Sequence, residues 1–137
     1  MKRAGLFLLT MVLWAAALLG TVNAEQTVDM DLSACNRAMT YAQMMQVYRA
    51  PEDYAGKLFC LKGKFNYSSL HDQAMIIFSD RAGCCEIAFP FQPAQALTYP
   101  DDYPPLYADI LLTARWAVPA DDPEASCYFC DAVIAWE

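Results

Sequence analysis

The chain has 137 residues, of which 57% are hydrophobic, and its 16 acidic residues outnumber its 9 basic ones, giving a formal net charge of −7. A chain of this length supports one domain with a modest core. The acidic balance argues against nucleic acid as a partner, because phosphate contacts require clustered Lys and Arg side chains. Past the N-terminal segment, such residues cluster only at Lys57, Lys62 and Lys64.

The N-terminal segment is typical of a secretory signal peptide. Lys2 and Arg3 precede an apolar run over residues 5–19, and small residues follow it. The run is about fifteen residues, shorter than the roughly twenty that a membrane-spanning helix needs. We expect cleavage that removes residues 1–24 and releases a single domain, residues 25–137, into the periplasm or the medium, with no membrane span. An uncleaved anchor is the alternative.

An amphipathic helix is the first regular element expected after the polar residues 25–32, which we expect to be extended or frayed. Thr40 and Gln43 have the spacing of a capping box at a helix start. Pro51 ends the helix, because the residue before a proline disfavours helical geometry. Apolar side chains recur at the spacing of one helical face, namely at Tyr41, Met44, Met45 and Tyr48.

After Gly56 the apolar period changes from helical to alternating, which predicts strands. The first strand covers residues 57–67, with Gly63 in its inward row at a tight bend. The next strands are expected at 75–78, at 85–89 before Pro90 and Pro93 stop it, at 110–117 and at 127–136. The inward row of residues 110–117 is Ile110, Leu112, Ala114 and Trp116, and that of residues 127–136 is Tyr128, Cys130, Ala132, Ile134 and Trp136.

One helix followed by five short strands predicts a mainly β protein. The pattern fits a small five-stranded barrel of the oligosaccharide/oligonucleotide-binding (OB) type with an N-terminal α-helix. A seven-stranded sandwich would need about two more strands than the sequence offers and is the weaker alternative.

Six cysteines lie within residues 25–137, and an even number in an oxidising compartment favours a disulfide framework. Cys84 and Cys85 are adjacent, and their Cα atoms are about 3.8 Å apart. This is below the roughly 4.4 Å that an unstrained disulfide requires, so we do not expect a bond between them. In a strand they would point to opposite faces. The alternatives are two separate disulfides, one disulfide plus a free thiol, or a turn that directs both thiolates at one metal.

Three stretches carry a family resemblance: Pro51-Glu52-Asp53-Tyr54-Ala55-Gly56-Lys57, Asp80-x-x-x-Cys84-Cys85 and Tyr99-Pro100-Asp101-Asp102-Tyr103-Pro104. They resemble a widespread group of uncharacterised exported bacterial proteins, many of them lipoproteins, with an OB-like barrel. The resemblance covers nearly all of residues 25–137. It implies the fold and an extracytoplasmic localisation, but no activity. It implies that Cys84, Cys85 and Cys127 are shared cysteines, with Cys127 four residues before Asp131-Ala132.

The chain departs from that group because it lacks a lipidation cysteine and has a shorter segment after the double cysteine. The double cysteine also resembles one in the OB-like extracytoplasmic part of a bacterial permease family linked to zinc.

The first functional hypothesis is a soft-metal site formed by Cys84, Cys85 and Cys127, with Glu86 or His71 as a fourth ligand. Zinc is the candidate metal, since thiolates bind it in a tetrahedral arrangement. On this hypothesis the protein is a monomeric, non-enzymatic binding or accessory module whose further ligand or protein partner is unknown.

Two other hypotheses compete with the metal site. In the first, the cysteines are structural, and Tyr99 and Tyr103 bind a sugar, a peptide or a cationic ligand. The alternative role for these tyrosines is to fix a long loop to the barrel. In the second, Cys127 and Cys130 form a redox CxxC motif, which is disfavoured because such motifs sit at a helix N-terminus and a strand is expected here.

Overall fold

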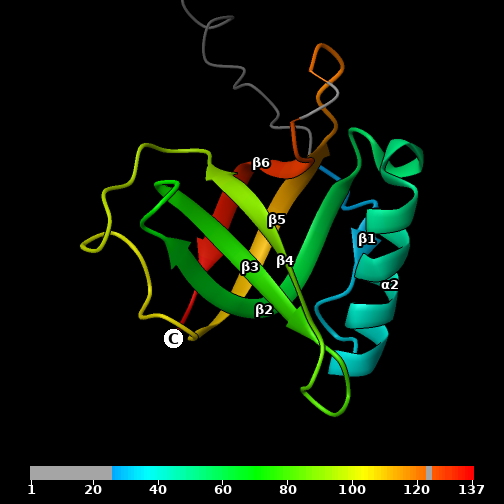
Figure 1. Cartoon of the computed structure of the whole chain (residues 1–137), viewed down its shortest axis with the longest axis horizontal. Coiled ribbons are helices and arrows are strands. Elements are labelled where there is room, and N and C mark those ends of the chain that lie inside the picture. The colour runs from blue at the N-terminus through cyan, green and yellow to red at the C-terminus, as the bar shows by residue number, and fades with distance from the viewer. Residues whose placement is uncertain (1–25, 123–124) are drawn as a thin grey trace, which may run out of the picture.

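The computed structural model describes residues 26–122 and 125–137, so the predicted signal peptide lies outside the described residues. The described chain is mainly β, with a six-stranded mixed sheet and one α-helix beside it (Figure 1). No helix in this part is long and apolar enough to cross a bilayer. In chain order the elements are β1 (Met30–Asp31), α2 (Arg37–Arg49), the 3-10 helix η2 (Pro51–Tyr54), β2 (Leu58–Ser68), β3 (Gln73–Ser79), β4 (Glu86–Pro93), β5 (Asp109–Ala117) and β6 (Tyr128–Ala135).

The strand pairings form a ring. The hydrogen-bonded order is β1-β2-β3-β4-β6-β5, and β5 also pairs with β2. The β1–β2 and β4–β6 pairs are parallel, and the other pairs are antiparallel. β2 has two antiparallel neighbours because it is 11 residues long: residues 58–64 pair with β5, and residues 64–68 pair with β3. The five predicted strands are all present, and the short β1 is a sixth that the sequence did not indicate.

Gly63 lies one residue before the position where β2 changes its partner. A Cβ atom added to Gly63 would lie 2.6 Å from Cγ1 of Ile76 and 2.9 Å from the carbonyl oxygen of Ile77. No side chain fits at these distances. The glycine predicted for a tight bend therefore permits the close approach of β2 to β3.

The core lies inside the ring and is built from alternating residues of its strands. The inward row predicted for β5 is confirmed, since Ile110, Leu112, Ala114 and Trp116 are each at most 2% exposed. In β2 the predicted residues Phe59, Leu61 and Phe65 are fully buried. The ring of Trp116 packs edge-on against that of Phe129, with centroids 4.9 Å apart, and its indole N–H donates a hydrogen bond to the carbonyl of Pro51.

Helix α2 begins four residues earlier than the capping box at Thr40 predicted, because its N-cap is Asn36 rather than Thr40. Its N-cap is Asn36, whose Oδ1 accepts a hydrogen bond from the backbone N–H of Met39 at 3.0 Å. Thr40 lies inside the helix, and its hydroxyl donates to the carbonyl of Asn36 at 3.2 Å. Asn is among the best N-cap residues, because its side-chain oxygen satisfies a free backbone donor. The predicted capping box is therefore wrong.

The buried face of α2 is rotated from the predicted one. Thr40, Met44 and Val47 are buried, whereas Tyr48 is 63% exposed. Met44 belongs to both faces, so the helix is turned by part of a turn, and packing against the sheet rather than the position of the helix start selects the buried face. Pro51 follows the end of the helix, as predicted, and begins the 3-10 helix.

The proline at position 90 does not stop the third predicted strand, and β4 continues to Pro93. β6 pairs with β4 from Phe91 onward, so the edge of β4 that faces β6 is unpaired before that point. Proline is tolerated at such an edge because no backbone donor is needed there.

A β-bulge interrupts the predicted inward row of β6. Ala132 is buried and Ile134 packs against the core, as predicted, whereas Tyr128 and Cys130 lie outside the core and Trp136 is 44% exposed. Arg115 of β5 opposes Cys130, but Thr113 opposes Val133, so β6 contains one extra residue between them. Asp131 has the positive φ of 52° that accompanies this irregularity. Phe129 and Ala132 are consequently the buried residues, and Tyr128 and Cys130 are outside the core.

Candidate functional site

The segment Asp80–Cys85 connects β3 to β4 and is folded around the Asp80 side chain. The backbone N–H of Asp80 donates to the carbonyl of Cys85 at 2.9 Å, and its carbonyl accepts from Gly83 at 3.2 Å. Its Oδ1 accepts a third hydrogen bond, from the backbone N–H of Cys84 at 3.0 Å. Gly83 has a φ of 72°, a conformation that glycine adopts without steric cost.

This turn brings two thiols and a carboxylate together. Sγ of Cys84 lies 3.8 Å from Sγ of Cys85 and 3.3 Å from Oδ2 of Asp80. Ligand atoms of the three residues all lie within 4.8 Å of one another. The alternation expected in a strand does not apply, because β4 begins at Glu86 and both cysteines precede it. Of the alternatives considered, the chain adopts the turn that gathers both sulfur atoms. We call Asp80, Cys84 and Cys85 the cysteine cluster.

Hydrogen bonding sets the protonation of the cysteine cluster. The hydrogen bond that the Cys84 thiol donates to Asp80, together with its contact with the Cys85 thiol, raises the pKa of the Cys84 thiol to about 11. In return, the hydrogen bond from the Cys84 thiol lowers the pKa of the Asp80 carboxyl. At neutral pH the free site therefore holds a protonated Cys84 thiol that donates to an ionised Asp80. Both cysteines are exposed, so a ligand from solvent reaches them directly.

Cys127, the third predicted metal ligand, is not part of the cysteine cluster. It precedes β6 and lines a separate cavity of about 690 Å³ together with His71, one of the predicted fourth ligands. The other predicted fourth ligand, Glu86, accepts a hydrogen bond from the hydroxyl of Ser79 at 3.1 Å. The fold thus gathers Cys84 and Cys85 around Asp80.

The cysteines form no disulfides, although the sequence favoured a disulfide framework. All six lie in the described segments, and all six are free thiols. Burial raises the pKa of the Cys127 thiol and of the Cys130 thiol. These two residues flank the start of β6, and no helix begins at them.

The predicted ligand-binding residues Tyr99 and Tyr103 pack on β2. The ring of Tyr99 stacks on Tyr67 with centroids 3.9 Å apart, and the ring of Tyr103 stacks on Phe65 at 5.4 Å. The Tyr67 hydroxyl donates to Asp72, and this bond raises the pKa of Tyr67 to about 12. Both predicted residues are half-buried against the core. Their rings fix the loop between β4 and β5, which is the alternative role considered for them.

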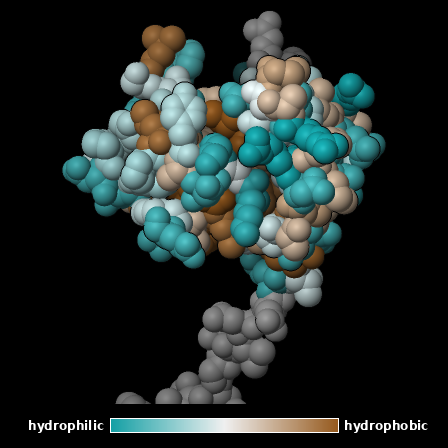
Figure 2. All heavy atoms as spheres, turned by 90° about the horizontal axis from the view of Figure 1, so that it is seen from below, coloured by the Kyte–Doolittle hydropathy of each residue, from teal (hydrophilic) through white to brown (hydrophobic). Residues whose placement is uncertain are grey.

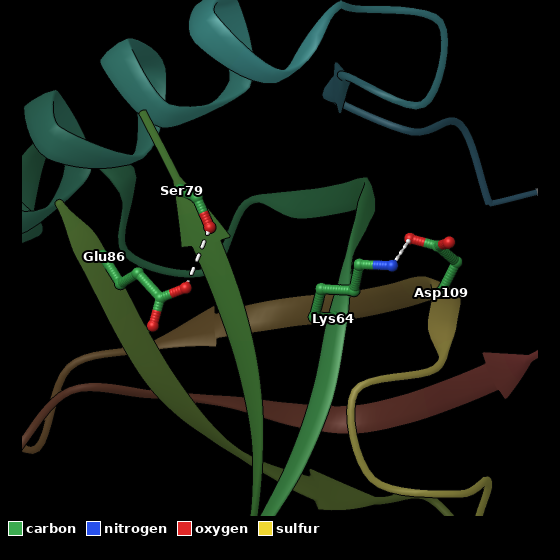
Figure 3. A network of polar contacts seen from close by, with 4 residues as sticks. All are labelled: Lys64, Ser79, Glu86 and Asp109. Atoms are coloured by element: carbon green, nitrogen blue, oxygen red, sulfur yellow. Dashed lines mark hydrogen bonds and ion pairs between the residues drawn. The ribbon is translucent and has the colours of Figure 1, made fainter. Parts of the chain in front are cut away.

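A groove of about 470 Å³ begins at the base of the Asp80–Cys85 turn. On one side lie Ser79 and Glu86, the residues that directly flank the turn. On the other side Nζ of Lys64 forms an ion pair with Asp109 at 2.8 Å. Figure 3 shows both pairs, on neighbouring strands next to helix α2. The lining also includes the basic Arg37 and Lys62, the thiol of Cys35, and the apolar Ile77 and Phe78.

The surface of the molecule is mixed in character. Figure 2 shows a face on which hydrophilic residues surround a hollow with hydrophobic residues at its floor. Among the described residues, Leu70 and Tyr48 are the most exposed large hydrophobic side chains, at 85% and 63%. Exposed side chains of this kind are normal on protein surfaces.

Sequence reasoning missed Asp80 as a third ligand and missed the groove. The signal for Asp80 was its spacing from the double cysteine, because an Asp that begins a tight turn accepts hydrogen bonds from the residues that follow it. The groove had no such signal, since its residues come from five separate segments of the chain.

No family model matches the chain, and neither a curated protein nor a solved structure shows significant similarity to it. The resemblance to exported OB-like proteins therefore stays a prediction, and the function must be argued from the cysteine cluster itself.

Proposed function

We propose that this protein is a non-enzymatic binding module that holds a thiophilic divalent cation, with zinc as the leading candidate, at Asp80, Cys84 and Cys85. The observation that carries the proposal is the separation of 3.8 Å between the two sulfur atoms. In a tetrahedral site with Zn–S bonds of about 2.3 Å, two sulfur ligands are about 3.8 Å apart. The two sulfur atoms of the cysteine cluster have this spacing.

The position of the Asp80 carboxylate supports the same geometry. With a Zn–O bond of about 2.1 Å, an oxygen and a sulfur ligand of one zinc ion would be about 3.6 Å apart. Oδ2 of Asp80 lies 3.3 Å from Sγ of Cys84, so a shift of a few tenths of an ångström suffices. A cation at this point replaces the thiol proton as the partner of the carboxylate, because coordination deprotonates a thiol outright.

We further propose that the ring of β2, β3, β4, β6 and β5 is a small OB-like barrel and that the protein is exported. The closed pairing order and the long β2 with Gly63 support the barrel. The signal-like residues 1–24 support export. A metal module outside the cytoplasm would be accessible to ions of the periplasm or the medium.

The two competing functions receive less support. Tyr99 and Tyr103 stack on other aromatic rings, which leaves less ring surface for a sugar or a peptide. For the CxxC motif, a redox thiol needs a lowered pKa, whereas burial raises the pKa of Cys127 and Cys130.

Metal analysis of the reduced, purified full chain after equilibrium dialysis against zinc tests the proposal. We expect one zinc ion per chain in the wild type and a loss of affinity of at least about tenfold in Cys84→Ser and Cys85→Ser, since each removes one thiolate ligand. Cys60→Ser is the matched control, because that cysteine lies on β2, apart from the cluster. Undiminished zinc binding by Cys84→Ser and Cys85→Ser would refute the proposal. A loss in Cys127→Ser would instead favour the ligand set predicted from the sequence.

A further inference from the structure

The cysteine cluster supplies three ligand atoms, and a tetrahedral cation takes four. Neither of the predicted fourth ligands is a member of the cluster, and Glu86 is engaged by Ser79. Zinc sites that keep one position for an exogenous ligand use three protein ligands in this way, whereas structural sites use four. The fourth position on this exposed turn is therefore open to a ligand from solvent.

Basic side chains gather around the same turn. Arg37 Nη1 lies 3.9 Å from the position that a Cβ atom of Gly83 would occupy, so this guanidinium reaches the middle of the turn. Arg37 and Arg81 together line a shallow depression at the start of α2. Lys62 lines the groove that begins at the base of the turn. Four of the nine basic residues of this acidic chain thus lie at the groove and the turn, with Lys64 as the fourth.

Three of these cations have no acidic partner. Within residues 26–122 and 125–137, the ion pair between Lys64 and Asp109 is the one salt bridge, and Arg37, Lys62 and Arg81 make none. A chain with 16 acidic residues has ample carboxylates to pair with them. Unpaired cations next to an open metal position form a local field that attracts an anion.

We propose that the fourth position is filled by a small oxyanion, a carboxylate or a phosphate, which binds the metal and Arg37 at once and extends into the groove toward Lys62. This inference rests on the proposed metal site. Guanidinium groups bind both kinds of oxyanion through two parallel hydrogen bonds, which fixes the orientation of the ligand. The groove volume of about 470 Å³ lies within the range of small-molecule sites, and Ile77 and Phe78 give it an apolar part.

Cobalt substitution tests the inference on the reduced full chain. Co²⁺ bound by thiolates absorbs strongly in the near ultraviolet, and its visible bands report the ligand in the fourth position. Succinate and inorganic phosphate are the two anionic probes, and succinamide is the uncharged control. We expect at least one anion to change the visible bands of the cobalt protein saturably, while succinamide leaves them unchanged.

Two variants locate the anion. In Arg37→Gln and Lys62→Gln, the affinity for the anion should fall by about tenfold or more, since each removes a charged hydrogen-bond donor. Their cobalt affinity should change less than about twofold, because neither residue is a metal ligand. Arg49→Gln is the matched control, as Arg49 lies at the opposite end of α2.

The two proposals fail in different ways. A wild type without a thiolate-to-cobalt band overturns the metal site and the anion site together. A cobalt protein with that band whose visible spectrum ignores both anions overturns the anion site alone. The anion site alone is also overturned if an anion binds with equal affinity to the cobalt forms of the wild type, Arg37→Gln and Lys62→Gln. If only one of the two probes binds, that probe identifies the ligand as a carboxylate or a phosphate.

Discussion

Replacing Gly63 by alanine is expected to destabilise the fold by about 2 kcal/mol. The new Cβ would lie 2.6 Å from Cγ1 and 2.9 Å from Cδ1 of Ile76, a fully buried side chain, and 2.9 Å from the carbonyl oxygen of Ile77. Overpacking a core costs up to about 3 kcal/mol. The lower entropy of an unfolded chain with alanine in place of glycine returns up to about 1 kcal/mol. The difference gives the expected cost.

Urea unfolding of the reduced protein measures this cost, and a second substitution separates its causes. Ile76→Val removes Cδ1, so the cost of Gly63→Ala should fall by about 1 kcal/mol in that background. The contacts with Cγ1 of residue 76 and with the Ile77 carbonyl remain, so the rescue should be partial. A Gly63→Ala protein within about 0.5 kcal/mol of the wild type would refute the reasoning, because overpacking of this severity cannot be neutral.

The remaining predictions concern the helix cap, the bulge and one tyrosine. Asn36→Ala should cost about 1 kcal/mol in urea unfolding, because it removes the hydrogen bond to the N–H of Met39; an unchanged midpoint would contradict this cap. Phe129→Ala should cost about 3–5 kcal/mol, whereas Cys130→Ala should be nearly neutral, since the bulge places only Phe129 in the core; similar costs would argue against the bulge. Tyr67 has a pKa raised to about 12 by its bond to Asp72, so its stabilising effect is complete below pH 10 and is lost as the pH rises toward 12. Tyr67→Phe should flatten the fall in stability between these pH values, and an unaltered pH profile would exclude the bond.

Alternation within single strands made much of the fold predictable. The inward rows of β2 and β5 follow from period-two patterns, because β5 has one buried side along its whole length and β2 has one from Phe59 to Phe65. The predictions that were wrong concern features that depend on the neighbouring strands. The bulge in β6 exists only in its pairing with β4 and β5, and Pro90 is tolerated in β4 because β6 begins to pair one residue later. A sequence pattern read along one segment carries no information on either neighbour.

The predicted start of α2 was wrong for a local reason. Thr40 and Gln43 match a capping box, but Asn36 offers an equally good cap one turn earlier. The buried face was also mispredicted, because the apolar residues of this helix do not lie in one narrow stripe and its buried face includes the polar Thr40. The choice between the two caps was made by packing, since Thr40, Met44 and Val47 face the core.

Half of the candidate site could be predicted. The adjacent cysteines marked Cys84 and Cys85 and excluded a bond between them, and the turn that unites them was among the alternatives. Cys127 was included through a family resemblance rather than a physical argument, and it lies outside the cysteine cluster. Asp80 was missed as a ligand because its role depends on how the turn folds around its carboxylate.

The pairing of β6 with both β4 and β5 has a consequence for how the chain acquires its structure. The last strand of the sequence joins two strands that do not pair with each other, and it contributes Phe129 to the centre of the core. A nascent chain that lacks its final residues therefore exposes two unpaired strand edges and an unfilled interior. Contacts between such distant segments also slow folding. Completion of this domain thus requires β6, and a truncation before Tyr128 should yield a protein prone to association through those edges.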